Sequence, residues 1–104
     1  MNTRAYIDWK NAVLKRDKRT CRMPGCGKKM KAMHVHHIRR WEDFPTLRFV
    51  VTNGITLCRK CHQNIWSKEE QYESLFHSII NSITEHSLLI LLDRFRHSEE
   101  NGDG

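Results

Sequence analysis

MHVHHI (33–38), NGITL (53–57) and CRKCH (58–62) are the parts of this 104-residue sequence that decide its fold. Two short β-prone runs, 33–38 and 54–57, are separated by a loop that contains Pro45, and they predict two strands paired as an antiparallel ribbon. A short helix is expected to follow, from Arg59 to about Trp66. Because neighbouring residues of a strand point to opposite faces, His36 and His37 are expected to have different roles.

The elements around this stretch predict one α+β domain. Helical periodicity at 4–18 indicates a first helix that packs on the central stretch. We expect a basic module over 1–68, a helical extension of the same domain over 69–97, and a disordered tail over 98–104. The first two-thirds of the chain has little apolar core to bury, so a metal ion is expected to help stabilise it.

The C-terminal helix has two predicted features. Ser67 to Glu70 has the Ser-x-x-Glu form of a capping box, which would open the helix. The apolar residues further on change face near 84–87, so the segment is either two helices with a break there or one helix that contacts two surfaces.

Four cysteines form two close pairs that are typical of a zinc site. Cys21-x4-Cys26 and Cys58-x2-Cys61 are separated by 31 residues, and four thiolates so spaced can close a tetrahedron around one ion. Cys58 to His62 also matches the Cys-x-x-Cys-His pattern of covalent haem attachment. Haem would leave the first pair unexplained and would normally require export, for which the N-terminal sequence gives no signal. We therefore expect structural zinc and no haem.

The positive charge is concentrated in the same region as the cysteines and histidines. Residues 1–68 hold 16 Lys/Arg against four Asp/Glu, a net charge of +12, whereas residues 69–104 hold two against eight, a net charge of −6. Such a basic block suits a polyanion such as DNA, with a merely solvated face as the alternative. The longest apolar run, 88–92, is far short of the roughly 20 residues of a membrane span. We expect a cytoplasmic protein that does not bind membranes.

Three quoted segments, taken in order and spacing, resemble the HNH endonuclease family. They are VLKRDKRTC from Val13, VHHI at 35–38 and NGITLCRKCH up to His62, and the likeness is strongest to four-cysteine members of phage and homing type. The resemblance covers about half of the chain. It implies a small ββα-metal core with structural zinc and flanking helices, and a DNA endonuclease of a bacterium or phage-infected host that leaves 5′-phosphate and 3′-hydroxyl ends.

The resemblance also implies a role for each residue of the histidine and asparagine set. His37 corresponds to the general base, and His36 and His62 correspond to the ligands of one catalytic divalent ion. Asn53 corresponds to the asparagine that braces the loop behind the base. Mg²⁺ is the expected ion, with Mn²⁺, Ni²⁺ and Zn²⁺ left open because imidazole binds several metals. His34 lies on the strand face of His36 and is given no role beyond an outer or solvated position.

Basic side chains near this set are the expected DNA contacts. They are Arg39, Arg40 and Arg48 around the site and Lys15, Arg16, Lys18 and Arg19 at the end of the first helix. Two other functions stay open: a non-catalytic zinc-stabilised module that binds nucleic acid, and an interaction protein that uses the apolar C-terminal segment. A homodimer through that segment would break both DNA strands; a monomer, which would nick one, is slightly favoured.

Overall fold

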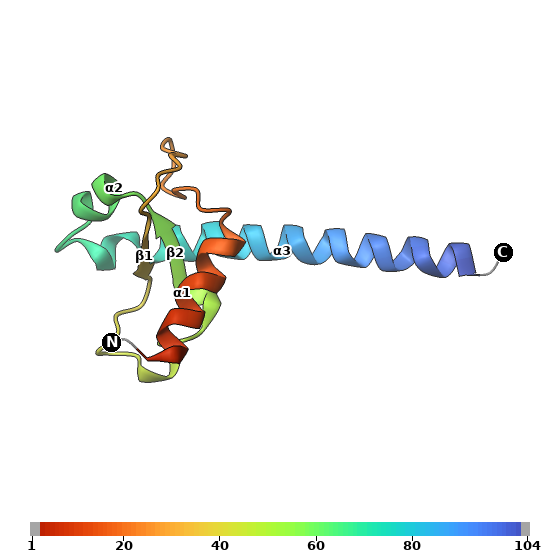
Figure 1. Ribbon diagram of the computed structural model, residues 1–104, viewed down its shortest axis with the longest axis horizontal. Coiled ribbons are helices and arrows are strands. Elements are labelled where there is room, and N and C mark those ends of the chain that lie inside the picture. Colours follow the sequence, from red (N-terminus) through yellow and green to blue (C-terminus); the bar gives the residue numbers. More distant parts are fainter. Residues whose placement is uncertain (1–2, 103–104) are drawn as a thin grey trace.

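Two short strands form the antiparallel ribbon at the centre of the molecule (Figure 1). They are β1 (His34–His37) and β2 (Gly54–Leu57), with His34 opposite Leu57 and His37 opposite Gly54. The structure, a computed structural model, describes the backbone of residues 3–102 and the side chains up to residue 94. The predicted ribbon and the α+β class are confirmed.

The helix α1 (Arg4–Arg16) packs against β2 at a glycine. A Cβ atom at Gly54 would lie 2.6 Å from Cγ2 of Val13 and 2.7 Å from the ring of Trp9, which is far too close. The φ angle of Gly54 is −122°, so this glycine is required for close packing and not for a turn. The helix ends two residues before the expected position because Lys18 is in the left-handed region, with φ of 53°.

A buried carboxylate joins the end of α1 to β2. Asp17 is fully buried, and its Oδ2 accepts a hydrogen bond of 3.0 Å from the backbone N–H of Thr56. Its charge is balanced by Arg16 at 2.7 Å and Arg22 at 3.5 Å. Removing one partner of such a buried pair leaves an uncompensated charge, so this contact fixes how the helix meets the strand.

The short helix α2 (Arg59–Asn64) follows β2 directly and leads into α3 (Glu69–Gly102). The predicted capping box is wrong. Ser67 has φ of 67° and forms the turn between the two helices, so α3 begins only at Glu69. The backbone N–H of Ser67 instead donates to the carboxylate of Glu69 at 3.1 Å.

Helix α3 is continuous, so the alternative of a break at 84–87 is wrong, whereas contact of its later half with a second surface stays a prediction. Its first half closes the core with Phe76 and Ile80, which are fully buried. Its second half projects away from the rest of the molecule (Figure 1). The backbone is helical to Gly102, and residues 103–104, part of the tail predicted at 98–104, lie outside the described part.

The core lies between the ribbon, α1 and the first half of α3. Its large apolar side chains come from α1, β2 and α3 and from residues that flank β1 and α2: Leu14, Met33, Ile38, Ile55, Leu57, Ile65, Phe76 and Ile80. The projecting half of α3 adds nothing to this core, and Leu88 to Leu92 are 42–65% exposed. By length and composition alone, Glu69–Arg94 could also cross a membrane, a test that core helices of soluble proteins pass as well.

Candidate metal centres and nuclease site

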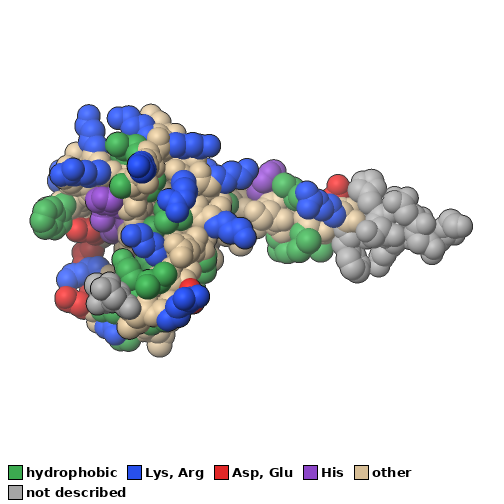
Figure 2. Space-filling view, in the orientation of Figure 1, with side chains coloured by type: hydrophobic (Ala, Val, Ile, Leu, Met, Phe, Trp, Pro, Cys, Tyr) green, Lys and Arg blue, Asp and Glu red, His purple; other side chains and the backbone are tan. Residues whose placement is uncertain are grey.

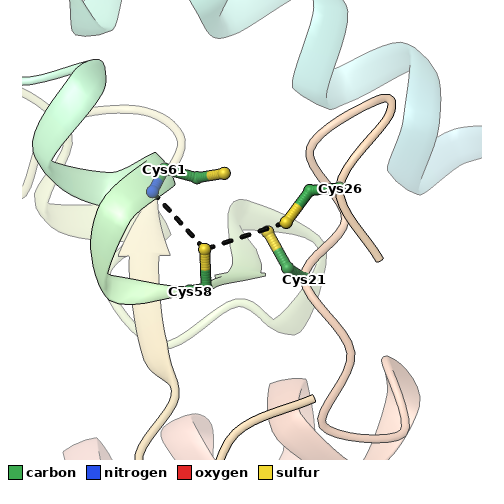
Figure 3. A group of neighbouring side chains, drawn as sticks. All are labelled: Cys21, Cys26, Cys58 and Cys61. Atoms are coloured by element: carbon green, nitrogen blue, oxygen red, sulfur yellow. Dashed lines mark hydrogen bonds between the residues drawn. The ribbon is translucent and has the colours of Figure 1, made fainter. Parts of the chain in front are cut away.

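The four cysteines converge on one point between the loop after α1 and the start of α2. All four sulfur atoms lie within 4.8 Å of one another, and those of Cys26 and Cys58 are 3.8 Å apart (Figure 3). Four sulfurs around one zinc ion, each at about 2.3 Å from it, are spaced by about 3.8 Å. The donor set and its spacing therefore fit the structural zinc that the sequence predicted.

The position of Cys58 favours its thiolate form. This residue caps the N-terminus of α2, and its Sγ accepts the backbone N–H of Cys61 at 3.5 Å. That hydrogen bond lowers the pKa of Cys58 to about 7, whereas burial raises the pKa of Cys21. A metal ligand must be the thiolate, so Cys58 is the member of the cluster best prepared to bind an ion.

His36 is a buried imidazole with an unused nitrogen. The side chain is only 8% exposed, and within the described part of the chain its Nε2 has no hydrogen-bond partner. Its ring faces His62 of α2 and Phe76 of α3, at centroid distances of 5.4 and 5.8 Å. Burial, and then the neighbouring His62, lower the pKa of His36 to about 4, which keeps the ring neutral. A neutral imidazole with a free lone pair is the form that binds a metal ion.

His62 lies close enough to His36 for both rings to share one ion. Two imidazoles that bind one ion at about 2.0–2.1 Å have ring centroids about 5 Å apart, close to the 5.4 Å seen here. The residues present thus fit the divalent ion that the sequence implied. Burial lowers the pKa of His62, His34 lowers it further, and Glu69 opposes both effects.

His34 makes a direct contact with His62 that the sequence did not reveal. The Nδ1 atoms of the two rings are 2.8 Å apart, and the rings meet edge to face at a centroid distance of 5.1 Å. The spacing of two residues already placed His34 on the same strand face as His36. Its contact with α2 depends on how that helix folds back over the ribbon, which no local pattern reports.

His37 occupies the opposite face of β1, as the strand periodicity predicted. Its ring stacks on Trp9 of α1 at 3.9 Å with an interplanar angle of 12°, and its Nε2 donates to the backbone carbonyl of Arg48 at 2.9 Å. A carbonyl only accepts, so Nε2 carries the proton and Nδ1 carries the lone pair. Burial lowers the pKa of His37, the bond to the carbonyl of Arg48 opposes this, and the charge of Arg48 adds to it.

Asn53 braces the loop directly after His37. Its buried side chain accepts the backbone N–H of Arg39 at 2.8 Å and donates to the carbonyls of Arg39 and Leu47, both at 3.2 Å. The backbone carbonyl of Asn53 also accepts the N–H of Ile38 at 2.8 Å. These bonds hold the chain on both sides of the β1–β2 loop, so the position of His37 is fixed from behind.

The two faces of β1 open into one cavity of about 790 Å³. His36, His37 and His62 all line it, together with Trp41 and with Glu69 at the start of α3. Figure 2 shows histidine side chains at the surface of this part of the molecule. All three histidines that the sequence singled out therefore border the same cavity.

Lysine and arginine side chains gather over the part of the molecule that holds the ribbon (Figure 2). Four of the expected DNA contacts are exposed there: Lys15, Lys18, Arg19 and Arg40. Arg40 is 54% exposed, lines the cavity and forms loose ion pairs with Glu42 and Asp43.

Three other expected DNA contacts have partners inside the protein. Arg16 is only 15% exposed, and besides Asp17 it donates to the carbonyls of Val51 and Gly54. Arg48 lies 4.5 Å from the ring of Trp41 and donates to its carbonyl at 2.7 Å, and Arg39 donates to His77 at 3.4 Å. Arg16 therefore stabilises the fold, whereas Arg39 and Arg48 are half-buried and do not line the cavity.

Comparison with known families identifies the segment that carries this arrangement. Residues 21–68 match the family model described as HNH endonuclease, and this segment contains all four cysteines and every histidine of the site. No curated protein matches the chain, and no solved structure does. The matched segment, the antiparallel ribbon and the four-cysteine cluster agree with one another. Over residues 21–68, the chain is similar to the HNH endonuclease family.

Proposed function

We propose that this protein is a metal-dependent endonuclease that hydrolyses DNA phosphodiester bonds to 5′-phosphate and 3′-hydroxyl ends. The observation that carries the proposal is the meeting of His36 and His62 over a cavity that His37 also lines. The likeness of residues 21–68 to the HNH endonuclease family implies nuclease activity, a divalent ion and a DNA substrate. The residues of this chain supply a site of matching chemistry.

In this proposal His36 and His62 hold one divalent ion. When bound, such an ion stabilises negative charge on the phosphate and on the leaving oxygen. His36 offers its buried, unpartnered Nε2 for this purpose. Imidazole nitrogen suits Mn²⁺, Ni²⁺ or Zn²⁺ at least as well as the expected Mg²⁺, so all four ions are worth comparing.

His37 acts as the general base. Its proton at Nε2 is tied to the carbonyl of Arg48, so the lone pair at Nδ1 accepts the proton from the attacking water. Stacking on Trp9 fixes the plane of the ring, and Asn53 fixes the loop that follows. The lowered pKa of His37 keeps this nitrogen unprotonated at neutral pH.

The substrate is proposed to be DNA because the surface around the site is strongly basic. The exposed Arg40 lies at the cavity, and Lys15, Lys18 and Arg19 form a second exposed group at the end of α1. Contacts of this kind bind the phosphate backbone whatever its sequence, and they weaken as salt rises. One site cuts one strand, so the expected monomer would nick.

The experiment is plasmid cleavage with each of the four ions, comparing the wild-type protein with His37→Ala and His86→Ala. His86 is an exposed histidine of α3, distant in sequence from the site, and so serves as the matched control. We expect His37→Ala to lose at least 100-fold in cleavage rate, in line with removal of a general base, and His86→Ala to cleave as the wild type does.

Salt-dependent DNA binding by the folded wild-type protein, with no cleavage under any ion, would contradict the proposal. That outcome would instead identify the non-catalytic zinc-stabilised binding module. Circular dichroism and DNA affinity of His37→Ala should match the wild type, because this substitution removes chemistry and leaves the metal ligands in place.

A further inference from the structure

Two other histidines contact the ring of His62. One neighbour is His36, with its buried and unpartnered Nε2. The other is His34, whose Nδ1 lies 2.8 Å from Nδ1 of His62. At that distance one of the two nitrogens carries a hydrogen atom and the other accepts it, since two lone pairs would repel each other.

The direction of this hydrogen bond decides which nitrogen of His62 can bind an ion. If Nδ1 of His62 donates, then the lone pair of His62 lies on Nε2, at the far side of the ring from His34. If Nδ1 of His62 accepts, its lone pair is used by His34 and Nε2 carries a proton, so neither nitrogen is free. Metal-binding histidines usually donate their second ring N–H to a fixed acceptor, which sets both tautomer and ring orientation.

We infer that His34 is a positioning residue for the nuclease site: its Nδ1 accepts the Nδ1 proton of His62 and leaves the Nε2 of His62 free for the divalent ion. An imidazole thus takes the place that a carboxylate or a backbone carbonyl often occupies next to a metal-binding histidine. The inference rests on the proposed ion site at His36 and His62 and deepens it. It assigns a role to a residue that the sequence left on the strand face without one.

The position of His34 suits this role better than direct binding of the same ion. His34 lines a smaller, neighbouring cavity of about 340 Å³, whereas His36 and His37 line the larger one, and His62 and Glu69 line both. Within the described part of the chain, the four cysteines are the only group of three or more metal-binding side chains whose ligand atoms lie within 4.8 Å of one another. His62 therefore stands between His34 on one side and the candidate ion site on the other.

Two substitutions of His34 distinguish the loss of a hydrogen-bond acceptor from a change in packing. His34→Phe keeps an aromatic ring and removes the acceptor, whereas His34→Gln keeps an acceptor oxygen on a flexible chain. We expect His34→Phe to lower the affinity for Mn²⁺ or Ni²⁺, measured by calorimetry on zinc-loaded full-length protein, by about 10- to 100-fold. His34→Gln should regain most of that loss, and His86→Phe should bind the ion as the wild type does.

The tautomer of His62 gives a readout that is independent of cleavage. Nitrogen-15 spectra of the wild-type protein without the second ion should show His62 protonated at Nδ1. The same spectra of His34→Phe should show a mixture or a shift toward protonation at Nε2. Circular dichroism checks that each variant is folded.

Three results would overturn the inference: His62 protonated at Nε2 in the wild type, unchanged ion affinity in folded His34→Phe, or equal losses in His34→Phe and His34→Gln. The last result would show that His34 binds the ion or shapes the pocket. Intact ion binding and the expected tautomer in a protein that never cuts DNA would count against the proposed function alone.

Discussion

At the scale of single residues, buried polar groups of this small domain are held by hydrogen bonds to residues that are distant in the sequence. Asp17 is tied to the N–H of Thr56, and Asn53 is tied to Arg39 and Leu47. In the described part of the chain, three buried side-chain atoms have no hydrogen-bond partner: Nε2 of His36, Oγ1 of Thr56 and Nε of Arg22. Only His36 of these three residues also faces His62 and lines the large cavity, and these positions together favour a ligand at its Nε2.

Gly54 is the residue whose replacement tests the packing of α1 most directly. We expect Gly54→Ala to lower the free energy of unfolding by about 1–3 kcal/mol, because the new methyl group would overlap Val13 and Trp9. Urea unfolding measures this.

Val13→Ala supplies the control for that substitution, since it removes the nearest overlapping atom. The double variant Gly54→Ala/Val13→Ala should be more stable than the sum of the two single losses predicts. Strict additivity would show that the glycine is needed for some reason other than the close approach of α1.

At the scale of elements, α3 has two halves with different surroundings. Phe76 and Ile80 are fully buried against the ribbon, whereas Leu89 and Leu91 are 65% and 61% exposed. The helix is held at its start by the core, and propagation by backbone hydrogen bonds carries it onward. In proteins most helical stability comes from tertiary packing, so the projecting half depends on the half that is packed.

Because only the first half of α3 is packed against the core, truncating a large apolar side chain should lower the free energy of unfolding more there than in the projecting half. Ile80→Ala should lower the free energy of unfolding by about 2–5 kcal/mol, because it leaves a cavity in the core. Leu91→Ala should change it by less than about 0.5 kcal/mol. Thermal or urea unfolding of dilute protein compares the two.

A large loss of stability in Leu91→Ala would show that a second copy or another surface covers residues 88–92. Sedimentation at several protein concentrations would then identify a dimer.

At the scale of the whole molecule, the cysteine cluster joins two segments that are distant in sequence. Cys21 and Cys26 come from the loop after α1, and Cys58 and Cys61 come from the start of α2 (Figure 3). His62 lies on the same short helix, so the cysteine cluster also fixes the position of one proposed ligand of the candidate ion site. Zinc binding would thus contribute to folding and to the geometry of the nuclease site at once.

Removal of zinc should therefore unfold the protein or greatly lower its Tm. We expect one tightly bound zinc per chain by elemental analysis, and loss of the cooperative thermal transition after treatment with a strong chelator. Cys26→Ser should behave like the chelated protein.

His62→Ala is the matched control, because it removes a proposed ligand of the catalytic ion and leaves the four cysteines intact. It should retain the zinc and most of the Tm. A chelated protein whose Tm does not change would contradict a structural role for the cluster.

Much of the architecture follows from local pattern. The runs at 33–38 and 54–57 predicted both strands and their pairing, and the cysteine spacing predicted a cluster that the structure brings within 4.8 Å. Strand periodicity also separated His36 from His37. These properties depend on residues that are neighbours in sequence or on a spacing that few folds can satisfy.

The contacts that complete the site were decided only by the tertiary structure. The His34–His62 contact joins residues 28 apart, the Asp17–Thr56 bond joins residues 39 apart, and Trp9 of α1 meets His37 across the fold. Arg16 turned inward for the same reason, because the carbonyls of Val51 and Gly54 meet the end of α1 only in the folded chain. Sequence periodicity fixes the face on which a side chain lies, whereas its partner depends on how separate elements pack together.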